Sequence, residues 1–182
     1  MADLTGRMVG AMKADVAMLT EIENDPAAFG QAITVIVIAG IASLIGNIFR
    51  AGIGAGIFGL VSSVISYLLF ALFVYLIGVK VMPEPSTKAD FNETFRVLGF
   101  AAAPGVFNVL AIIPVLGILV SFVIWIWSLV IGVIAIREVL DYSNTGRAMI
   151  VAVIAWVLCM IVIFVVLTPI FVTLGLIRAI TG

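Results

Sequence analysis

The sequence contains no histidine, a single cysteine and few charged side chains. Without histidine, the chain lacks the residue that most often serves as a metal ligand and as a general base near neutral pH. The one cysteine, Cys159, stands in an apolar stretch, so neither a disulfide framework nor a thiolate metal site is available. From these absences we expect no catalytic residues, no metal and no cofactor.

Charge is missing from four long segments of the chain. Charged residues make up 10% of the sequence and hydrophobic residues 64%, against about 25% and roughly 45–50% in soluble domains. All nine basic and ten acidic residues lie outside four runs: Pro26–Phe49, Ala51–Val79, Val97–Ile136 and Ala148–Ile177. Such runs are typical of a chain that crosses a bilayer. They disfavour enzymes and ion pumps, which need an ionisable group at depth, and without a basic run we expect no nucleic-acid partner.

The lengths of these runs predict five membrane-spanning helices. A helix needs about 20 residues, at about 1.5 Å each, to cross the ~30 Å hydrocarbon layer. The second run is too long for one crossing, and the glycine-rich segment 51–56 at its start indicates a turn. The third run is long enough for two crossings, with a break at Pro114 followed by Gly117, and Asp90 with Glu93 predicts a capped helix start before it. We therefore predict spans at about 31–49, 57–79, 96–113, 115–136 and 148–177, the last bent at Thr168-Pro169.

Lysine and arginine are distributed unequally between the two ends of such a bundle. With five spans, the side opposite the N-terminus carries only Arg50 and Arg178, and the N-terminal side carries the other seven: Arg7, Lys13, Lys80, Lys88, Arg96, Arg137 and Arg147. Because basic residues accumulate in cytoplasmic loops, we expect a cytoplasmic N-terminus and an outside C-terminus in the cell inner (plasma) membrane. The charged residues before the first span lead us to expect no secretory signal.

Residues 1–25 are predicted to form a cytoplasmic amphipathic helix. Apolar side chains recur at three- and four-residue intervals between Leu4 and Ile22, with acids and bases on the opposite face. Such a helix either lies in the membrane interface or docks on the cytoplasmic face of the protein itself, and the pattern fits both. The expected fold is therefore all-α and polytopic: an N-terminal amphipathic helix, then a domain of five transmembrane helices over residues 26–182.

Few polar groups lie within the predicted spans, and Asn108 is the most prominent of them. An amide at membrane depth needs a hydrogen-bond partner. Pro104 leaves the carbonyl of Phe100 without its helical donor, so one interpretation is a polar pocket around Pro104 and Asn108. The favoured interpretation is a set of hydrogen bonds that joins the helices. Trp125 and Trp127 lie near the middle of the fourth span and are expected to pack on other helices or to face lipid.

The middle of the chain resembles the Yip1 domain family, in particular its short prokaryotic members. The matching features are Phe95–Pro104 (FRVLGFAAAP), Ile112–Pro114 with Gly117, and Ile124–Trp127 (IWIW). The pair Gly99-Phe100 stands where eukaryotic members have Gly-Tyr at the entry to the third span, but their Asp-Leu-Tyr-Gly-Pro signature is absent. The Rab GTPase binding of those members is therefore not carried over. The resemblance implies a five-span membrane protein without catalytic residues, and the candidate polar and packing site is Gly99, Phe100, Pro104, Asn108 and Pro114.

The sequence favours a non-catalytic integral membrane protein of the Yip1 type. We expect it to organise the membrane, or to dock as a small structural accessory subunit with a partner membrane complex. The expected partners are membrane lipids and either a larger membrane protein complex or a second copy of the chain. The alternative is a transporter or channel-like component, in which Pro104, Asn108, Thr168 and Pro169 line a weakly polar path between broken helices.

Overall fold

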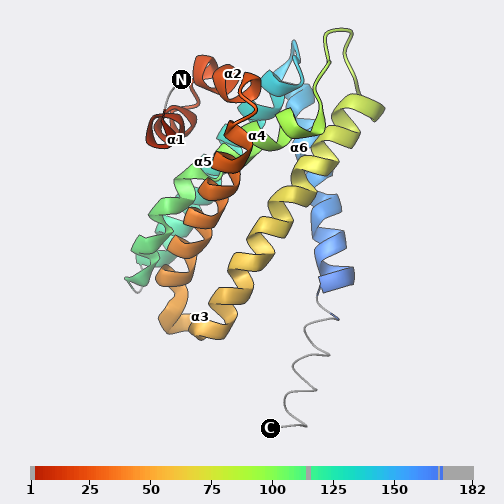
Figure 1. The fold of residues 1–182 in the computed structure, drawn as a ribbon. Helices are drawn as coiled ribbons and strands as arrows, with labels where there is room; N and C mark the ends of the chain where they lie inside the picture. The colour runs from red at the N-terminus through yellow and green to blue at the C-terminus, as the bar shows by residue number, and fades with distance from the viewer. Residues whose placement is uncertain (1–2, 114–115, 168, 170–182) are drawn as a thin grey trace.

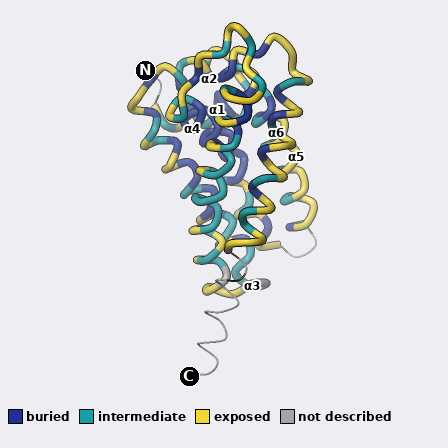
Figure 2. The backbone as a smooth tube through the Cα atoms, turned by 90° about the vertical axis from the view of Figure 1, so that its right-hand side faces the viewer, coloured by how far each residue is buried: buried dark blue, intermediate teal, exposed yellow. Residues whose placement is uncertain are grey.

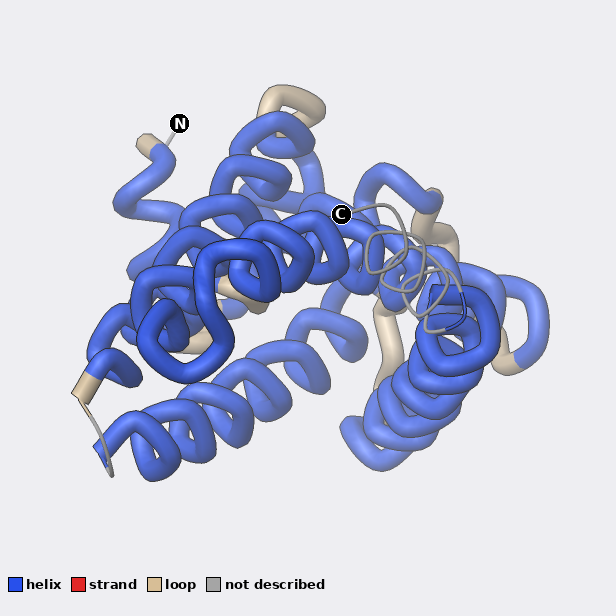
Figure 3. The backbone as a smooth tube through the Cα atoms, turned by 90° about the horizontal axis from the view of Figure 1, so that it is seen from below, coloured by secondary structure: helices blue, strands red, loops and turns tan. Residues whose placement is uncertain are grey.

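The computed structural model describes residues 3–113, 116–167 and 169, and every element among them is a helix, a turn or a loop (Figure 3). In chain order the elements are α1 Leu4–Met12, α2 Val16–Asn24, α3 Ala28–Tyr75, η1 Leu76–Val81, α4 Phe91–Phe100, η2 Ala103–Ile112, α5 Leu116–Val139, α6 Thr145–Val162 and η3 Ile163–Leu167. η1 and η3 are π-helices and η2 is a 3-10 helix.

Five segments are long and apolar enough to cross a membrane, which confirms the predicted all-α fold with five spans. They are Ala28–Ile48, Gly52–Val81, Phe91–Ile112, Leu116–Val139 and Thr145–Val166. The third of these is the central one, because 67% of its most apolar 18-residue stretch is buried, against 17% in the second and in the fifth.

α3 contains the first two spans, which are joined by a sharp turn at Gly52. Gly52 has a φ of 75°, in the left-handed region that glycine adopts without strain. The two helical arms, here called the first arm (residues 28–51) and the second arm (residues 53–75), diverge from this turn (Figure 1). The turn predicted from the glycine-rich segment 51–56 is therefore present, but helix resumes directly after Gly52 rather than near residue 57.

The third span is not one continuous α-helix. α4 begins with a capping box, as predicted: the side chain of Asp90 accepts from the N–H of Glu93 and the side chain of Glu93 accepts from the N–H of Asp90, both at 2.8 Å. α4 ends at Phe100, four residues before Pro104, which has no N–H to continue the α-helical hydrogen bonds. The chain then continues as the 3-10 helix η2, so the third span changes its helix type around Pro104.

The N-terminal segment forms two short helices, which corrects the prediction of a single amphipathic helix. Ala14 has a φ of 54° and ends α1, and Asp15 then caps α2 by accepting from the N–H of Ala17. The apolar period continues across this break, so the break is hidden in the hydropathy pattern. Both helices pack on the bundle, and the side chains that they bury are Arg7, Ala11, Leu19 and Ile22.

The bundle is tightly packed at one end and more open at the other. Figure 2 shows the buried backbone concentrated at the end that carries α1, α2 and α4, here called the capped end, and thinning toward the turn at Gly52, here called the turn end. The main buried cluster draws on the halves of the helices nearest the capped end: residues 28–39 and 71–77, 95–103, 133–140 and 148–155.

Polar contacts join the two loops at the capped end. Glu84, in the loop after η1, accepts from the N–H of Ser143 at 3.0 Å, and its carboxylate pairs with Arg147 at 3.3 Å. The hydroxyl of Tyr142 donates to the carbonyl of Met82 at 2.8 Å. The helix ends and connections that meet at this end carry the seven basic residues predicted to share one side: five lie on helices (Arg7, Lys80, Arg96, Arg137 and Arg147) and two in connections (Lys13 and Lys88).

Candidate functional site

The first and third spans approach each other closely through small residues. A Cβ atom built on Gly99 would lie 2.7 Å from the Cβ of Ala32, and one built on Gly105 would lie 2.7 Å from the Cβ of Ala39. Neither glycine therefore has room for a side chain. Small residues let membrane helices pack backbone against backbone, and here they hold the broken third span against the first arm.

Asn108 lies on η2, where its main chain contacts the first arm. A Cβ atom built on Gly46 would lie 2.0 Å from the backbone oxygen of Asn108, so this contact requires glycine. The 3-10 backbone that follows Pro104 carries both this carbonyl and the half-buried Asn108 side chain. The break in the third span thus determines where the amide of Asn108 lies.

The two arms of α3, the η2 segment and the first half of α5 line a cleft of about 470 Å³. Its apolar lining includes Leu44, Leu60, Ile124 and Trp125. Its polar side chains are Ser43 and Asn47 of the first arm, Ser63 and Tyr67 of the second, Asn108 of η2, and Ser121 and Ser128 of α5. Most of the polar groups within the spans therefore converge on one space, and none of the side chains that line it is charged. This cleft is the candidate functional site.

Most of the polar side chains in the cleft have unused hydrogen-bonding capacity. Only two are engaged: the amide of Asn47 donates to the carbonyl of Ser43 at 2.9 Å, and the hydroxyl of Ser63 donates to the carbonyl of Leu60 at 2.8 Å. Within the described part of the chain, no hydrogen bond is made by the other five side chains, those of Ser43, Tyr67, Asn108, Ser121 and Ser128.

Five residues were predicted as a polar and packing site, and of the four that the structure describes, Asn108 alone lines the cleft. Gly99, Phe100 and Pro104 are buried in the packed part of the third span. Pro114 lies outside the described residues, as does Thr168 of the alternative polar path. Pro169 does not line the cleft. The structure thus separates a packing group around Gly99 from a polar cleft that includes Asn108.

A second polar group lies at the capped end and holds the N-terminal helices. Arg7 of α1 is buried, with 1% of its surface exposed. Its guanidinium donates to Asp25 at 2.5 Å, to Glu21 at 3.0 Å and to the side-chain oxygen of Gln31 at 2.8 Å. These contacts connect α1 to α2 and to the start of the first arm. The buried charge is therefore used to attach the N-terminal helices.

Glu23 of α2 lies beside the third span. The guanidinium of Arg96 donates to the backbone oxygen of Glu23. Burial raises the pKa of the Glu23 side chain to about 7, and the nearby carboxylate of Asp141 adds to this effect. The hydrogen bond from Arg7, by contrast, lowers the pKa of Asp25. Among the described residues, no group of three or more histidine, cysteine, aspartate or glutamate side chains could hold a metal ion.

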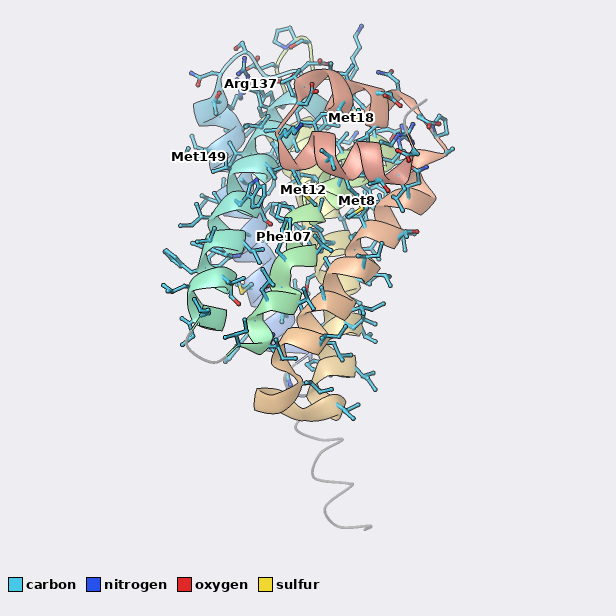
Figure 4. All side chains as sticks on the ribbon, turned by 90° about the vertical axis from the view of Figure 1, so that its left-hand side faces the viewer. Met8, Met12, Met18, Phe107, Arg137 and Met149 are labelled. Atoms are coloured by element: carbon cyan, nitrogen blue, oxygen red, sulfur yellow. The ribbon has the colours of Figure 1, made fainter. Side chains whose placement is uncertain are left out.

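Trp127 anchors α1 on the flank of the bundle, a role that the sequence did not reveal. Its indole N–H donates to the carbonyl of Met12 at 2.8 Å, and its ring stacks on Phe107 with the ring centres 5.9 Å apart. Figure 4 shows Met12 and Phe107 on the same side of the bundle, with α1 across it. Of the two expectations for Trp127, packing rather than lipid exposure is correct. The position of a tryptophan in the middle of a span was the one sequence feature that pointed to such a role. Its partner could not be predicted, because a backbone carbonyl is present at every residue and has no sequence pattern.

Comparison with known proteins identifies the family to which this chain belongs. No curated protein and no solved structure matches the chain significantly. The family model described as the Yip1 domain matches residues 16–167. The match begins at α2 and includes the third span and all the residues of the cleft, while α1 with Arg7 precedes it. Because the match covers most of the sequence, the chain belongs to the Yip1 domain family.

Proposed function

We propose that this protein is a non-catalytic accessory subunit that docks with a partner membrane protein and thereby organises the surrounding membrane. The observation that carries the proposal is the contrast between the third span, whose most apolar stretch is 67% buried, and the second and fifth spans, where only 17% is buried. The buried charged groups support it as well, because Arg7, Asp25 and Arg96 are engaged in joining α1 and α2 to the bundle.

The exposed flank is formed by the second arm and α6. Only 17% of the most apolar stretch is buried in each of these spans. Val153 and Val157 of α6 are exposed, as are Leu68 and Leu72 of the second arm. Van der Waals packing is a main attraction between helices in a bilayer. The exposed apolar side chains of the second arm and α6 could therefore pack against the helices of a partner.

Site-specific photocrosslinking in native membranes tests the docking role. A photoreactive residue replacing the exposed Val157 should yield a discrete protein adduct, whereas the same residue replacing the buried Val151 of α6 should yield none. If exposed positions on both spans of the flank give lipid adducts alone, and the extracted protein is always a single copy, the docking role is wrong.

We further propose that the capped end faces the cytoplasm and that the protein resides in the inner (plasma) membrane. The support is the distribution of seven basic residues on one side against two on the other. A Gly182→Cys variant in a Cys159→Ser background should react with a membrane-impermeant thiol reagent applied to intact cells. Labelling of that cysteine after cell lysis only would refute this orientation.

A transport function is the second candidate, and the polar lining of the cleft favours it. A path across the bundle would also have to open the packed core between the cleft and the capped end, which includes the buried Phe95 and Phe100. Solute flux into proteoliposomes tests this candidate. If the wild type carries a measurable flux and a folded Asn108→Leu variant does not, transport is supported over the accessory role.

A further inference from the structure

The cleft combines hydrogen-bonding groups with an apolar surface inside the membrane-spanning part of the protein. Five side chains in it make no hydrogen bond with the described residues: Ser43, Tyr67, Asn108, Ser121 and Ser128. A polar group without a partner is costly in an apolar surrounding. A bound molecule with polar groups that pair with these side chains would therefore be stabilised in the cleft.

The chemistry of the five side chains defines the polar part of that occupant. The amide of Asn108 can both donate and accept, and so can the hydroxyls of Tyr67 and the serines. No lysine or arginine lines the cleft, so a phosphate would find no cation there. The matching ligand group is neutral and both donates and accepts hydrogen bonds, as a hydroxyl does.

The apolar lining and the closure of the cleft define the rest of the occupant. Leu44, Leu60, Ile124 and Trp125 line the same space, and Trp125 is half exposed at its margin. The buried cluster of the bundle lies between the cleft and the capped end. The volume of about 470 Å³ is within the roughly 300–1,000 Å³ of small-molecule sites. A molecule that enters therefore comes from the bilayer or from the turn end.

We propose that this cleft binds a neutral lipid through a free hydroxyl on its headgroup, as in a diacylglycerol. The hydroxyl pairs with Asn108 and its polar neighbours, and the acyl chains lie along the apolar lining. This inference goes beyond the accessory role, because the residues of the second arm that line the cleft, such as Ser63 and Tyr67, are not the exposed residues, Leu68 and Leu72, that it contributes to the flank with α6.

Photolabelling in vesicles tests the proposal. The full chain is reconstituted into phosphatidylcholine vesicles that contain a small fraction of diacylglycerol with a photoreactive acyl chain, and labelled peptides are identified by mass spectrometry. Label is expected on the cleft segments of α3, η2 and α5. Unlabelled diacylglycerol should compete, whereas phosphatidic acid with the same chains and free glycerol should not.

Variants show whether the polar groups are responsible. Loss of one hydrogen bond should weaken binding by about 3- to 10-fold, so Tyr67→Phe and Asn108→Leu should each reduce labelling by that order. Ser66→Ala is the matched control, because Ser66 is half-buried on the same arm but does not line the cleft. Tyr67→Phe keeps the ring and so keeps the measurement informative if Asn108→Leu fails to fold.

Three results would overturn the proposal. Equal competition by phosphatidic acid would mean that the headgroup is not recognised. Labelling that is unchanged in Tyr67→Phe and in a folded Asn108→Leu variant would mean that the polar groups do not contribute. Competition by free glycerol as strong as that by diacylglycerol would identify a soluble polyol as the ligand, and would favour the transport function instead.

Discussion

Arg7 on the first helix and Asp25 immediately before the first span form a buried ion pair, with 2.5 Å between the guanidinium nitrogen Nη2 and the carboxylate oxygen Oδ2. The pair connects residues 18 positions apart in the sequence and closes the N-terminal segment over the bundle. Asp25 also accepts from the N–H of Ala27 at 2.9 Å, so one carboxylate both orders the start of the first arm and holds α1.

Removing the charge of Asp25 should therefore destabilise the folded protein. In Asp25→Asn, the buried guanidinium of Arg7 loses its closest carboxylate and keeps Glu21 as its remaining ionic partner, so the free energy of unfolding should fall. The free energy of unfolding in mixed micelles with a denaturing detergent measures this loss. Asp3→Asn is the matched control, because Asp3 is an exposed helix cap and asparagine caps equally well. A loss of equal size in both variants would contradict the special role of the pair.

Stability should depend on pH through Glu23. Its folded-state pKa of about 7 lies above the ordinary value of 4.5, so between these values the folded protein holds a proton that the unfolded chain has released. The free energy of unfolding should then fall as the pH rises from about 4.5 to about 7 and level off above that range. Comparing Glu23→Gln with the wild type in unfolding experiments at pH 5 and 7.5 measures the effect. An identical decline in the variant would refute it.

The lowered pKa of Asp25 acts in a different pH range and in the opposite direction. Its carboxylate is stabilised in the folded state by Arg7, so the stability that it contributes is present above the unfolded pKa and is lost as the pH falls through the folded one. The two effects are separable, because Asp25→Asn removes the acid-side loss and Glu23→Gln removes the decline toward neutral pH.

Gly46 and Gly132 should respond with opposite signs to replacement by alanine. The Cβ of Gly46→Ala would enter the contact with the Asn108 carbonyl, and overpacking of this kind costs about 1–3 kcal/mol. Gly132 in α5 has nothing within 4 Å of a built Cβ, so Gly132→Ala should stabilise its helix by about 0.5–1 kcal/mol. Thermal unfolding of the two variants in the same detergent tests the pair. Equal tolerance at both positions would mean that the first and third spans are not in such close contact.

Trp127→Phe should loosen α1 without unfolding the bundle. The variant keeps a ring to stack on Phe107 but loses the N–H that donates to Met12, a contribution of about 1 kcal/mol. Faster tryptic cleavage at the exposed Lys13 is the expected result. The control is Trp156→Phe, which changes an exposed tryptophan of α6, and trypsin should cleave this variant at the wild-type rate. Unchanged cleavage in Trp127→Phe would show that the bond does not hold α1.

The number of spans and the main breaks were predictable because they depend on local properties of the sequence. Hydropathy and length yield five crossings, the glycines at 51–56 indicate the turn, and Asp90 with Glu93 marks the start of α4. Pro104 interrupts its helix through its own missing N–H, wherever the chain lies in the bundle. These features need no knowledge of tertiary contacts.

The cleft and the attachment of the N-terminal helices depend on contacts between distant segments and could not be predicted. Ser43 and Ser121 lie in separate apolar runs of the sequence, and the packing of both α3 and α5 against η2 brings them to one space. Arg7 reads as a surface charge until α1 folds back on Asp25. The left-handed conformation at Ala14 has no sequence signal of its own, although Asp15 is a good helix cap.

The central claim is that the bundle is closed at the capped end. This closure distinguishes a cleft that binds a ligand from a path that crosses the membrane. Cysteine accessibility tests it most directly, with a Ser63→Cys variant in a Cys159→Ser background and a membrane-impermeant thiol reagent added to one side of sealed vesicles at a time. The control is Ser86→Cys, in the exposed loop at the capped end. We expect the cysteine at position 86 to react only from the capped side and the cysteine at position 63 to show no reaction from that side. Rapid labelling of position 63 from the capped side would contradict the account.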